Sequence, residues 1–327
     1  MYRHLRSQLL GNFQEMYYVL ATTPAKQEAS SEIYEKIYEK IKEADAVLVG
    51  ISAGMSSANG PSFNPYDGGE FFQKHYAPFI EKYGFKESFT PLHMEFPDRR
   101  DHWGYRVLYT KATEDLEIGS SYLLLKELLD EKPYHIINTN LDGQGPRVFP
   151  LEHQTIVQGE VHYLQCSQKC HDHVYDWSDK VNEMYEAMDG GTGIPEEMIP
   201  YCPKCGEEMN LWGRPWNFLE GKDYKESWQR AVDFIEDYAD HKIVLLELGV
   251  GMMTPEFIKI PFINMTHRLP HATYIPMSYE HAIVPAHIKE KSLPVPGDLM
   301  EPLTKLVELK EKDRVEDNAF KTNPTNN

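Results

Sequence analysis

The chain contains four cysteines, arranged as two close pairs: Cys166 and Cys170, then Cys202 and Cys205. Four thiolates in two such pairs match a tetrahedral zinc site, and a zinc ion with four protein ligands has no open position for a substrate. Two other interpretations stay open, namely four buried free thiols, or a site in which His171 or His173 replaces one cysteine. The spacing favours zinc held by the four cysteines as a scaffold and not as a Lewis acid.

A stretch of small residues at positions 52–60, SAGMSSANG, could let backbone N–H groups approach a pyrophosphate. The stretch lacks the glycine spacing of the usual dinucleotide fingerprint, so a tight strand-to-helix turn is an equally good interpretation. Two later stretches raise the same question. Residues 138–143 (NTNLDG) could hydrogen-bond a carboxamide and a ribose, and residues 248–251 (LGVG) permit close backbone approach, but both compositions are also typical of ordinary turns.

Three buried strands are predicted immediately before these stretches. The first is the continuous apolar run 46–51, and it follows a helix pattern with N-cap candidates Ser30 and Ser31. Helix patterns also precede the runs 134–138 and 243–248. Repeated helix-then-strand units predict an α/β fold with a doubly wound, Rossmann-like parallel sheet, whose ligands bind at the carboxyl ends of the strands.

The remaining segments are expected to be additions to that sheet. Aromatic-rich residues 61–118 predict a helical cap over the ligand crevice, and the cysteine-bearing residues 164–212 predict an inserted small zinc-binding module. Residues 298–327 are rich in charge and predict a flexible tail. The Rossmann-like domain would then consist of three segments: 30–60, 119–163 and 213–297.

The composition is that of an ordinary folded protein of 327 residues, 41% hydrophobic and 26% charged. The balance of 33 Lys and Arg against 51 Asp and Glu gives a formal net charge of −18. A surface that acidic repels phosphate backbones and anionic lipid. No apolar run approaches the roughly 18 to 20 residues of a membrane span, and no signal peptide is recognised. We therefore expect a cytoplasmic protein that binds neither nucleic acid nor membrane.

The order of these motifs resembles the sirtuin family. Residues 52–56 (SAGMS) look like its Gly-Ala-Gly-Ile-Ser loop, and residues 139–142 (TNLD) look like its Gln-Asn-Ile-Asp turn. Three further stretches are closest to the macrodomain-linked class M branch: 157–160 (VQGE), 209–211 (MNL) and 246–255 (LELGVGMMTP). The resemblance covers about residues 30 to 290.

The resemblance implies an NAD-binding Rossmann-type domain, a small domain with structural Zn²⁺, and cleavage of NAD at the nicotinamide glycosidic bond. Ser52 stands where the family's first loop glycine usually stands, and Thr139 replaces its glutamine. Carried over by position, the residues expected to bind NAD are Ser52, Ala53, Gly54, Ser56, Thr139, Asn140, Asp142, Gln158, Gly249, Val250 and Asn264.

The most informative departure from the family pattern is Gln158. Deacylating sirtuins carry a histidine there, which acts as general base so that the acyl group can migrate. An amide does not titrate near neutral pH and cannot take that proton. Loss of nicotinamide and capture of the sugar by a nucleophile remain feasible. Class M members are similar in carrying glutamine here and are ADP-ribosyltransferases.

The resemblance therefore predicts NAD-dependent transfer of ADP-ribose to a partner protein. Asn140 is expected to orient nicotinamide, Asp142 to hydrogen-bond near the scissile ribose and Gln158 to position the sugar hydroxyls. Glu160 is the candidate to draw a proton from the acceptor or to offset developing positive charge. Two alternatives stay open: a deacylase in which His153 or His162 substitutes for the missing base, and a non-catalytic NAD-binding sensor.

Class M relatives in some cases modify a lipoylated carrier protein similar to the glycine-cleavage H protein, so such a partner, and a macrodomain hydrolase in the same pathway, are implied here. An acidic acceptor would need a local basic patch on this strongly negative chain. Arg99, Arg100 and Arg106 could form one, although three nearby arginines are more often a solvated helix face.

Overall fold

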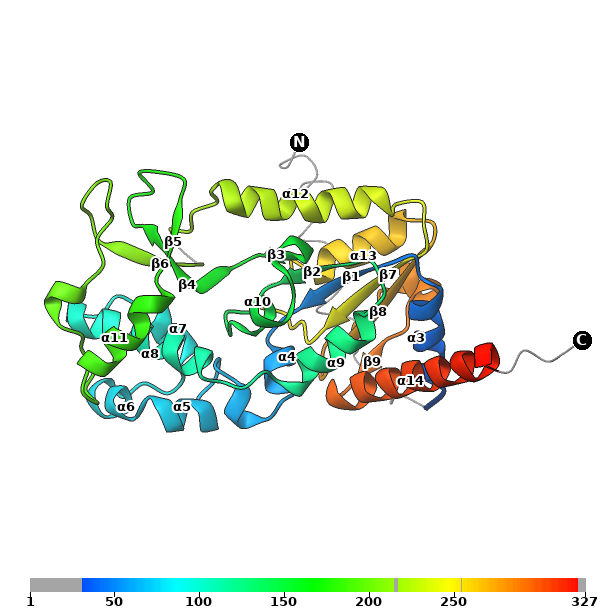
Figure 1. The fold of residues 1–327 in the computed structure, drawn as a ribbon, viewed down its shortest axis with the longest axis horizontal. Coiled ribbons are helices and arrows are strands. Elements are labelled where there is room, and N and C mark those ends of the chain that lie inside the picture. The colour runs from blue at the N-terminus through cyan, green and yellow to red at the C-terminus, as the bar shows by residue number, and fades with distance from the viewer. Residues whose placement is uncertain (1–30, 215–216, 254, 323–327) are drawn as a thin grey trace, which may run out of the picture. The chain divides into compact units, whose positions relative to one another are not determined.

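A computed structural model describes residues 31–214, 217–253 and 255–322, with no account of the side chains of residue 31 and residues 318–322 (Figure 1). The predicted cap Ser30 and the motif residue Thr254 lie outside the described residues. The chain forms two compact units. Unit 1 contains the described residues of 31–58, 120–137 and 231–322, and unit 2 contains those of 59–119 and 138–230.

Unit 1 is built on parallel strands. The strands are β1 (Ala46–Ile51), β2 (Tyr134–Asn138), β7 (Ile243–Leu248), β8 (Ala272–Ser278) and β9 (Val295–Pro296). The helices are α3 (Ser31–Glu43), α4 (Gly54–Ser57), α9 (Ser120–Leu129), α13 (Lys259–Arg268), α14 (Met300–Thr322) and the 3-10 helix η4 (Ala286–Lys291). Helix α12 (Lys222–Asp237) begins in unit 2 and ends in unit 1.

The sheet has the order β3-β2-β1-β7-β8-β9, and the pairs β1–β7, β7–β8 and β8–β9 are parallel. Every residue of β1 and β7 is buried, as continuous apolar runs predict for strands covered on both faces. Ile51 lies opposite Leu248, and Leu248 lies opposite Met277. Because these strands end in register, the residues that follow them meet at one edge of the sheet. The predicted α/β parallel sheet is confirmed.

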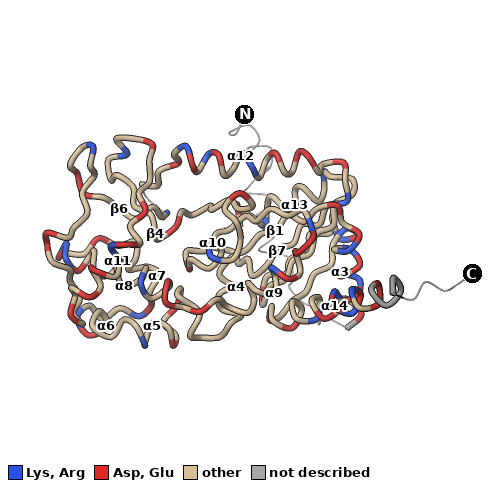
Figure 2. The backbone as a smooth tube through the Cα atoms, viewed as in Figure 1, with Lys and Arg blue, Asp and Glu red and all other residues tan. Residues whose placement is uncertain are grey.

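Helix α14 corrects the prediction of a flexible tail from position 298. Leu303 and Leu306 are fully buried and Val307 nearly so, and α14 packs on α9 and α3. Lys310 adds hydrogen bonds from Nζ to the backbone oxygens of Glu127 and Asp130 at 2.5 and 2.9 Å. The prediction was wrong because charged residues, which Figure 2 shows along α14, outnumber the apolar positions at i, i+3 and i+4.

Unit 2 combines helices with a small antiparallel sheet of order β5-β4-β6. The strands of this small sheet are β4 (Gly159–Cys166), β5 (Val174–Asp176) and β6 (Met209–Gly213). Unit 2 also contains β3 (Gln154–Ile156), which belongs to the six-stranded sheet. Its α-helices are α5 (Glu70–His75), α6 (Ala77–Tyr83), α7 (Phe89–Leu92), α8 (Arg99–Glu114), α10 (Gln144–Val148) and α11 (Ser178–Ala187). Three 3-10 helices complete it: η1 (Pro61–Phe63), η2 (Leu151–His153) and η3 (Glu196–Met198).

The aromatic residues that predicted a cap form the core of unit 2. Phe71, Phe79 and Trp103 are fully buried, and they share one apolar cluster with residues of the cysteine-bearing segment. Trp103 of α8 packs edge-on against Trp177, with ring centroids 5.8 Å apart. The predicted cap and zinc module are thus one folded body, which also includes residues 138–163 and the described residues of 213–230, all of which the sequence analysis assigned to the Rossmann-like domain.

Candidate functional site

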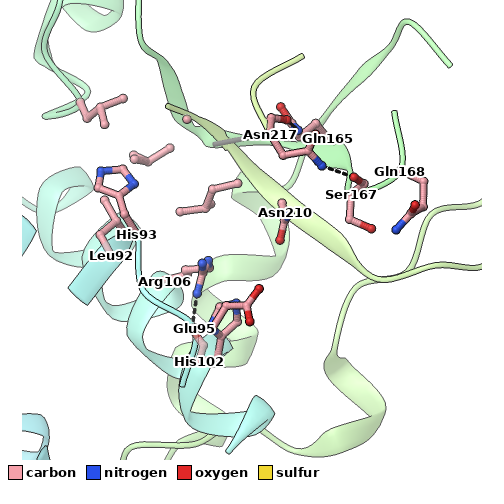
Figure 3. A pocket seen from close by; sticks show the side chains of 14 residues that line it. Leu92, His93, Glu95, His102, Arg106, Gln165, Ser167, Gln168, Asn210 and Asn217 are labelled. Carbon is pink, nitrogen blue, oxygen red and sulfur yellow. Dashed lines mark hydrogen bonds between the residues drawn. The ribbon is translucent and has the colours of Figure 1, made fainter. Parts of the chain in front are cut away.

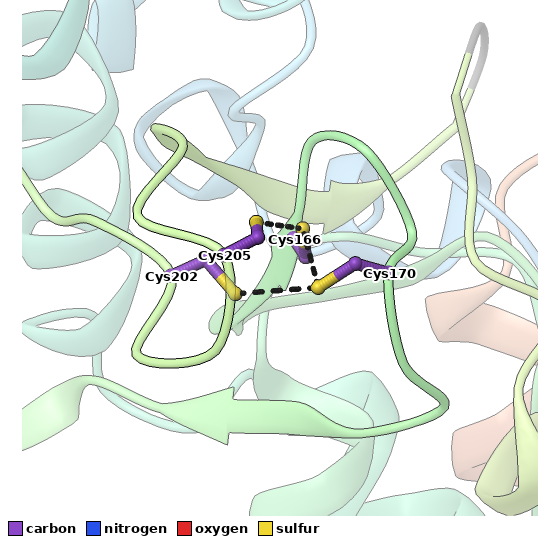
Figure 4. A group of neighbouring side chains, drawn as sticks. All are labelled: Cys166, Cys170, Cys202 and Cys205. Atoms are coloured by element: carbon purple, nitrogen blue, oxygen red, sulfur yellow. Dashed lines mark hydrogen bonds between the residues drawn. The ribbon is translucent and has the colours of Figure 1, made fainter.

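The four cysteines meet in unit 2 with the geometry of a metal site. The Sγ atom of Cys166 lies 3.5 Å from those of Cys170 and Cys205, the Sγ atoms of Cys170 and Cys202 are 3.7 Å apart, and all four lie within 4.8 Å of one another (Figure 4). A tetrahedral zinc ion with Zn–S bonds of about 2.3 Å separates its ligands by roughly 3.8 Å. The donor set and its spacing therefore fit zinc.

The turn after Cys202 prepares its sulfur to bind a cation. Burial opposes ionisation of this thiol, but hydrogen bonds from the backbone N–H groups of Cys205 and Lys204 and from the His171 side chain lower its pKa to about 6. The Nε2 atom of His171 lies 3.4 Å from the Cys202 Sγ and 3.2 Å from the Tyr175 hydroxyl. His171 thus contacts a ligand from outside the group of four cysteines.

In unit 1, the small-residue stretch turns directly from β1 into the single turn of α4. The Gly54 N–H donates to the Gly249 carbonyl at 3.1 Å, and the Ser52 N–H donates to the Leu248 carbonyl at 3.2 Å. A Cβ atom added at Gly54 would lie 2.3 Å from the Gly249 Cα, and one added at Gly249, where φ is +65°, would lie 2.4 Å from the Gly54 Cα. Both positions require glycine because the two backbones touch.

These two glycines open onto a cavity of about 420 Å³ at the carboxyl edge of the sheet. Its wall is formed by residues that follow β1, β7 and β8, together with the turn before α14: Gly54, Ser57, Ala58, Gly249, Gly251, Ser278, Tyr279, Glu280, His281, Gly297, Asp298 and Leu299. Of the predicted NAD-binding residues, Gly54 and Gly249 line this cavity. Ser56 and Val250 are buried, and Asn264 lies half-buried on α13.

A buried ion pair supports one wall of this cavity. Lys259 of α13 and Glu247 of β7 are fully buried and paired through their charged ends. The Tyr274 hydroxyl donates to Glu247 Oε2 at 2.6 Å, and Lys259 Nζ donates to the His281 carbonyl at 2.8 Å. This network fixes the backbone of His281, which lines the cavity. It was not recognised from sequence, because Glu247 lies inside an otherwise apolar strand.

In unit 2, the turn after β2 carries two of the four predicted catalytic residues. Asn140 and Asp142 are almost fully buried. The Asn140 N–H donates to Asn138 Oδ1 at 2.8 Å, and the Gln144 N–H donates to Asp142 Oδ1 at 3.0 Å. These side-chain to backbone bonds fix the turn.

Gln158 lies against the same turn, although it follows by more than fifteen residues in sequence. Its Nε2 atom donates to the backbone carbonyl of Thr139 at 2.8 Å. The structure therefore brings together Thr139 and Gln158, two of the residues that the sequence analysis placed in one site.

Glu160 forms an acid–base pair with His162. The His162 Nδ1 atom lies 2.8 Å from Glu160 Oε1, and the His162 N–H donates to Glu160 Oε2 at 3.0 Å. Burial lowers the pKa of His162, but the hydrogen bond and charge of Glu160 outweigh it and raise this pKa above its ordinary value. A Cβ atom at Gly143 would lie 3.1 Å from His162 Cε1, so the pair sits beside the turn.

The sequence analysis named His162 only as a substitute base and did not name Tyr109. Glu160 and His162 are two residues apart on β4, and alternation on a strand could have indicated that they share a face. The Tyr109 hydroxyl of α8 is fully buried without a hydrogen-bond partner among the described residues. Burial first, and then the charge of Asp142, raise its pKa well above the ordinary value. No local sequence signal places Tyr109 near Asp142.

No helix in the described ranges is long and apolar enough to cross a membrane. No family model matches the chain. The parallel sheet and the four-cysteine cluster define an α/β protein with a candidate zinc-binding module. Two solved Sir2 structures align at 14% identity: a complex with deacetylated p53 peptide and 3'-O-acetyl ADP-ribose (TM-score 0.46, 84% of this chain and 97% of that one), and a complex with an inhibitor and 2'-O-acetyl-ADP-ribose (TM-score 0.43, 85% and 99%).

Two curated relatives match more specifically. A protein ADP-ribosyltransferase of Staphylococcus aureus strain Mu50 is 34% identical over 260 residues, which are 78% of this chain and 81% of the relative. A probable bifunctional ADP-ribose hydrolase/ADP-ribosyltransferase of Fusarium oxysporum f. sp. cubense is 27% identical over 231 residues, and the match spans 67% of this chain but 37% of that longer protein. The staphylococcal match shows that the chain belongs to the family of this protein ADP-ribosyltransferase.

Proposed function

We propose that the chain is an NAD-dependent protein ADP-ribosyltransferase of sirtuin type. The observation that carries this proposal is the 34% identity, over most of both chains, to a protein named for this activity. Gln158 agrees with it. A neutral amide held against Thr139 can hydrogen-bond a sugar hydroxyl but cannot remove its proton, so it suits transfer better than acyl migration.

The residues of unit 2 provide the chemistry that transfer requires. The glycosidic bond from ribose C1′ to the nicotinamide nitrogen breaks, nicotinamide leaves as a neutral molecule, and an acceptor oxygen, nitrogen or sulfur forms the new bond to C1′. Asn140 would hold the carboxamide, while Asp142 and Gln158 would hold the ribose. The acceptor's proton would pass to Glu160, whose bond to His162 offers a path onward to the imidazole.

The residues of unit 1 would hold the phosphate and adenosine portion of NAD. Ser52, Ala53, Gly54 and Ser56 present small side chains at the turn after β1. Gly54 and Gly249 give the cavity of about 420 Å³ a wall without side chains, which allows a phosphate to approach the backbone. Val250 and Asn264 would contribute beside them.

Zinc would act as structure in this protein. Cys166, Cys170, Cys202 and Cys205 supply all four ligands, so the ion would stabilise the fold without activating a substrate. Cys166 and Cys202 belong to the aromatic core that also contains α8. The ion would therefore support the unit that carries Asn140 and Gln158.

The acceptor is proposed to be a partner protein, with a lipoylated carrier similar to the glycine-cleavage H protein as the first to test. A macrodomain hydrolase in the same pathway would make the modification reversible. The motif resemblance to class M sirtuins supports both, and the fungal relative's name pairs the two activities in one chain.

The direct test is incubation of zinc-loaded protein with biotin-labelled NAD, cell extract and, separately, a purified lipoylated carrier. The wild type should transfer label to protein and release nicotinamide. Asn140→Ala and Gln158→Ala should lower labelling at least tenfold, whereas Gln73→Ala, an exposed glutamine of α5, should not. Absence of label on any protein, with the wild type folded, would contradict the proposal.

A second candidate, NAD-dependent deacylation, is favoured by the imidazole of His162 beside the Asn140–Gly143 turn. His153, the other histidine considered, is exposed on η2. Release of free lysine from acyl peptides, lost in His162→Asn and kept in His153→Asn, would support deacylation. NAD binding without nicotinamide release would instead indicate a sensor.

A further inference from the structure

Unit 2 contains a second cavity, of about 360 Å³, that the proposed NAD chemistry does not use (Figure 3). Four apolar side chains line it: Leu92, Leu141, Val161 and Leu211. Its polar lining comes from α8, β4, β6 and the loops beside them: His93, Glu95, His102, Arg106, Gln165, Ser167, Gln168, Asn210 and Asn217.

Arg106 is the unusual residue of this wall. It is 7% exposed, and its Nη1 atom donates to the His102 carbonyl at 3.0 Å. Its Nε atom has no hydrogen-bond partner, and no carboxylate lies within ion-pair distance of its guanidinium among the described residues. The guanidinium also lies over the Trp103 ring, 5.9 Å from the centroid. Burial lowers the pKa of Arg106 to about 10, and the charges of Glu208 and Glu95, which act from beyond ion-pair distance, offset this only in part. A buried cation without a carboxylate at hydrogen-bond distance is costly, which indicates a site that a ligand completes.

The neighbouring arginines behave differently, so they do not form one basic patch with Arg106. Arg99 is half exposed and paired with Glu208 at 2.5 Å. The Arg100 Nε atom donates to the Ile194 carbonyl at 2.9 Å. The sequence analysis grouped the three arginines, but the structure separates one buried, unpaired guanidinium from two engaged ones.

Arg106 is the positively charged group among the residues that line this cavity, because the two histidines there are neutral at pH 7. Burial, and then the charge of Arg106, lower the pKa of His93 to about 4 and that of His102 to about 3, so both are neutral at pH 7. Glu95 is exposed at the rim. The side chains of Gln165 and Asn217 already hydrogen-bond backbone groups. Asn210 of β6 remains as a neutral polar partner for a ligand (Figure 3).

Two residues that line the cavity are neighbours, along the chain, of the candidate catalytic residues of unit 2. Leu141 stands between Asn140 and Asp142, and Val161 follows Glu160. A molecule in this cavity would therefore lie along the backbone that carries the candidate site.

We propose that this cavity binds an aliphatic carboxylate, with the apolar chain against Leu92, Leu141, Val161 and Leu211 and the carboxylate on Arg106. A guanidinium presents its N–H donors in a fork that matches a carboxylate, and such charge-assisted bonds are roughly twice as strong as neutral ones. The carboxylate belongs either to a free small molecule or to a side chain of the acceptor protein.

The test compares hexanoate with hexanamide, which differ only in the charge of the end group, by calorimetry on the zinc-loaded full chain without NAD. The wild type should bind hexanoate at least tenfold more tightly than hexanamide. Arg106→Gln should remove this preference, and Arg106→Lys should retain part of it. Arg99→Gln, which removes the same charge from an exposed position of the same helix, should leave it unchanged.

If Arg106→Gln fails to fold, Asn210→Phe provides the second test, because it fills the cavity and leaves Arg106 intact. Hexanoate binding should then be lost. Equal binding of the two compounds by the wild type, no detectable binding at millimolar concentration, or unchanged hexanoate binding in Asn210→Phe would each overturn the proposal. None of these readouts depends on ADP-ribosyl transfer, so they are independent of the proposed activity.

A further arm identifies the source of the carboxylate. It compares a capped pentapeptide with a central glutamate against the same peptide with glutamine. Tighter binding of the glutamate peptide than of hexanoate would assign the cavity to a protein side chain, and the reverse would assign it to a small molecule.

Discussion

Replacing Lys259 by methionine should destabilise unit 1 and loosen the wall of its cavity. The change leaves Glu247 fully buried with the Tyr274 hydroxyl as its remaining partner in the network. It also removes the 2.8 Å hydrogen bond from Lys259 to the His281 carbonyl. Burial already raises the pKa of Glu247, and loss of the opposing charge of Lys259 should raise it further.

The magnitude follows from the complete burial of the pair. Removing one partner of a buried ion pair costs about 3–5 kcal/mol, a large part of the roughly 5–15 kcal/mol of a typical domain. At about 2–4 °C for each kcal/mol in a domain of this size, the melting temperature should fall by roughly 6–20 °C. NAD affinity should also fall, because His281 lines the cavity.

Thermal unfolding of the full zinc-loaded chain measures this effect. Lys40→Met is the matched control, because the Lys40–Glu43 pair is half exposed at 4.0 Å and should contribute less than about 1 kcal/mol. The double variant Glu247→Gln/Lys259→Met should recover much of the loss, since an amide can still accept from Tyr274 without a buried charge. A Lys259→Met melting temperature within about 2 °C of wild type, or a double variant no more stable than the single one, would refute the reasoning.

Three further predictions concern the cavity of unit 1, the Glu160–His162 pair and the four-cysteine cluster. Gly249→Ala should weaken NAD binding at least tenfold by calorimetry, because alanine at φ +65° costs about 1–2 kcal/mol and its Cβ would press the turn after β1 out of place; unchanged affinity would contradict the close approach. Glu160→Gln should alter the pH dependence of stability. Because the pKa of His162 is raised in the folded state, the Glu160–His162 pair stabilises the fold below pH about 6.5 and loses this effect as pH rises through the folded-state pKa. Between pH 6 and 8.5, the melting temperature should therefore fall more in wild type than in the variant. Chelation of the metal, or Cys205→Ser, should expose the aromatic core of unit 2, which a change in tryptophan fluorescence would report, and should lower transferase activity at the same time. A metal-free protein with unchanged fluorescence would show that zinc does not stabilise the fold of this unit.

The parts of the fold that could be predicted from sequence are those encoded in short continuous patterns. The runs 46–51 and 243–248 are apolar throughout because both faces of their strands are covered, and the structure buries every residue in them. The cysteine pairs are equally local, since each pair is a single turn whose spacing sets the reach of its sulfurs. The motif order predicted the family.

Features that depend on distant partners were not predicted. The helix at 300–322 was predicted as a tail, because its buried positions, such as Leu303 and Leu306, are meaningful only against α9 and α3. Arg106 was grouped with two exposed arginines, because its burial depends on β4 and β6, which come much later in the chain. The roles of individual residues in the proposed NAD-binding segments of unit 1 and of unit 2 remain predictions for the variants above.

The contact between Gly54 and Gly249 also limits how this protein can evolve. A side chain at either glycine would clash with the backbone of the other. Neither glycine can therefore be replaced by a larger residue unless the end of one of the two strands moves. Relatives that fold in this way should therefore either keep glycine at both places or have lengthened one of the two turns. We therefore expect that evolution loses these glycines through insertions in one of the two turns and not through single substitutions.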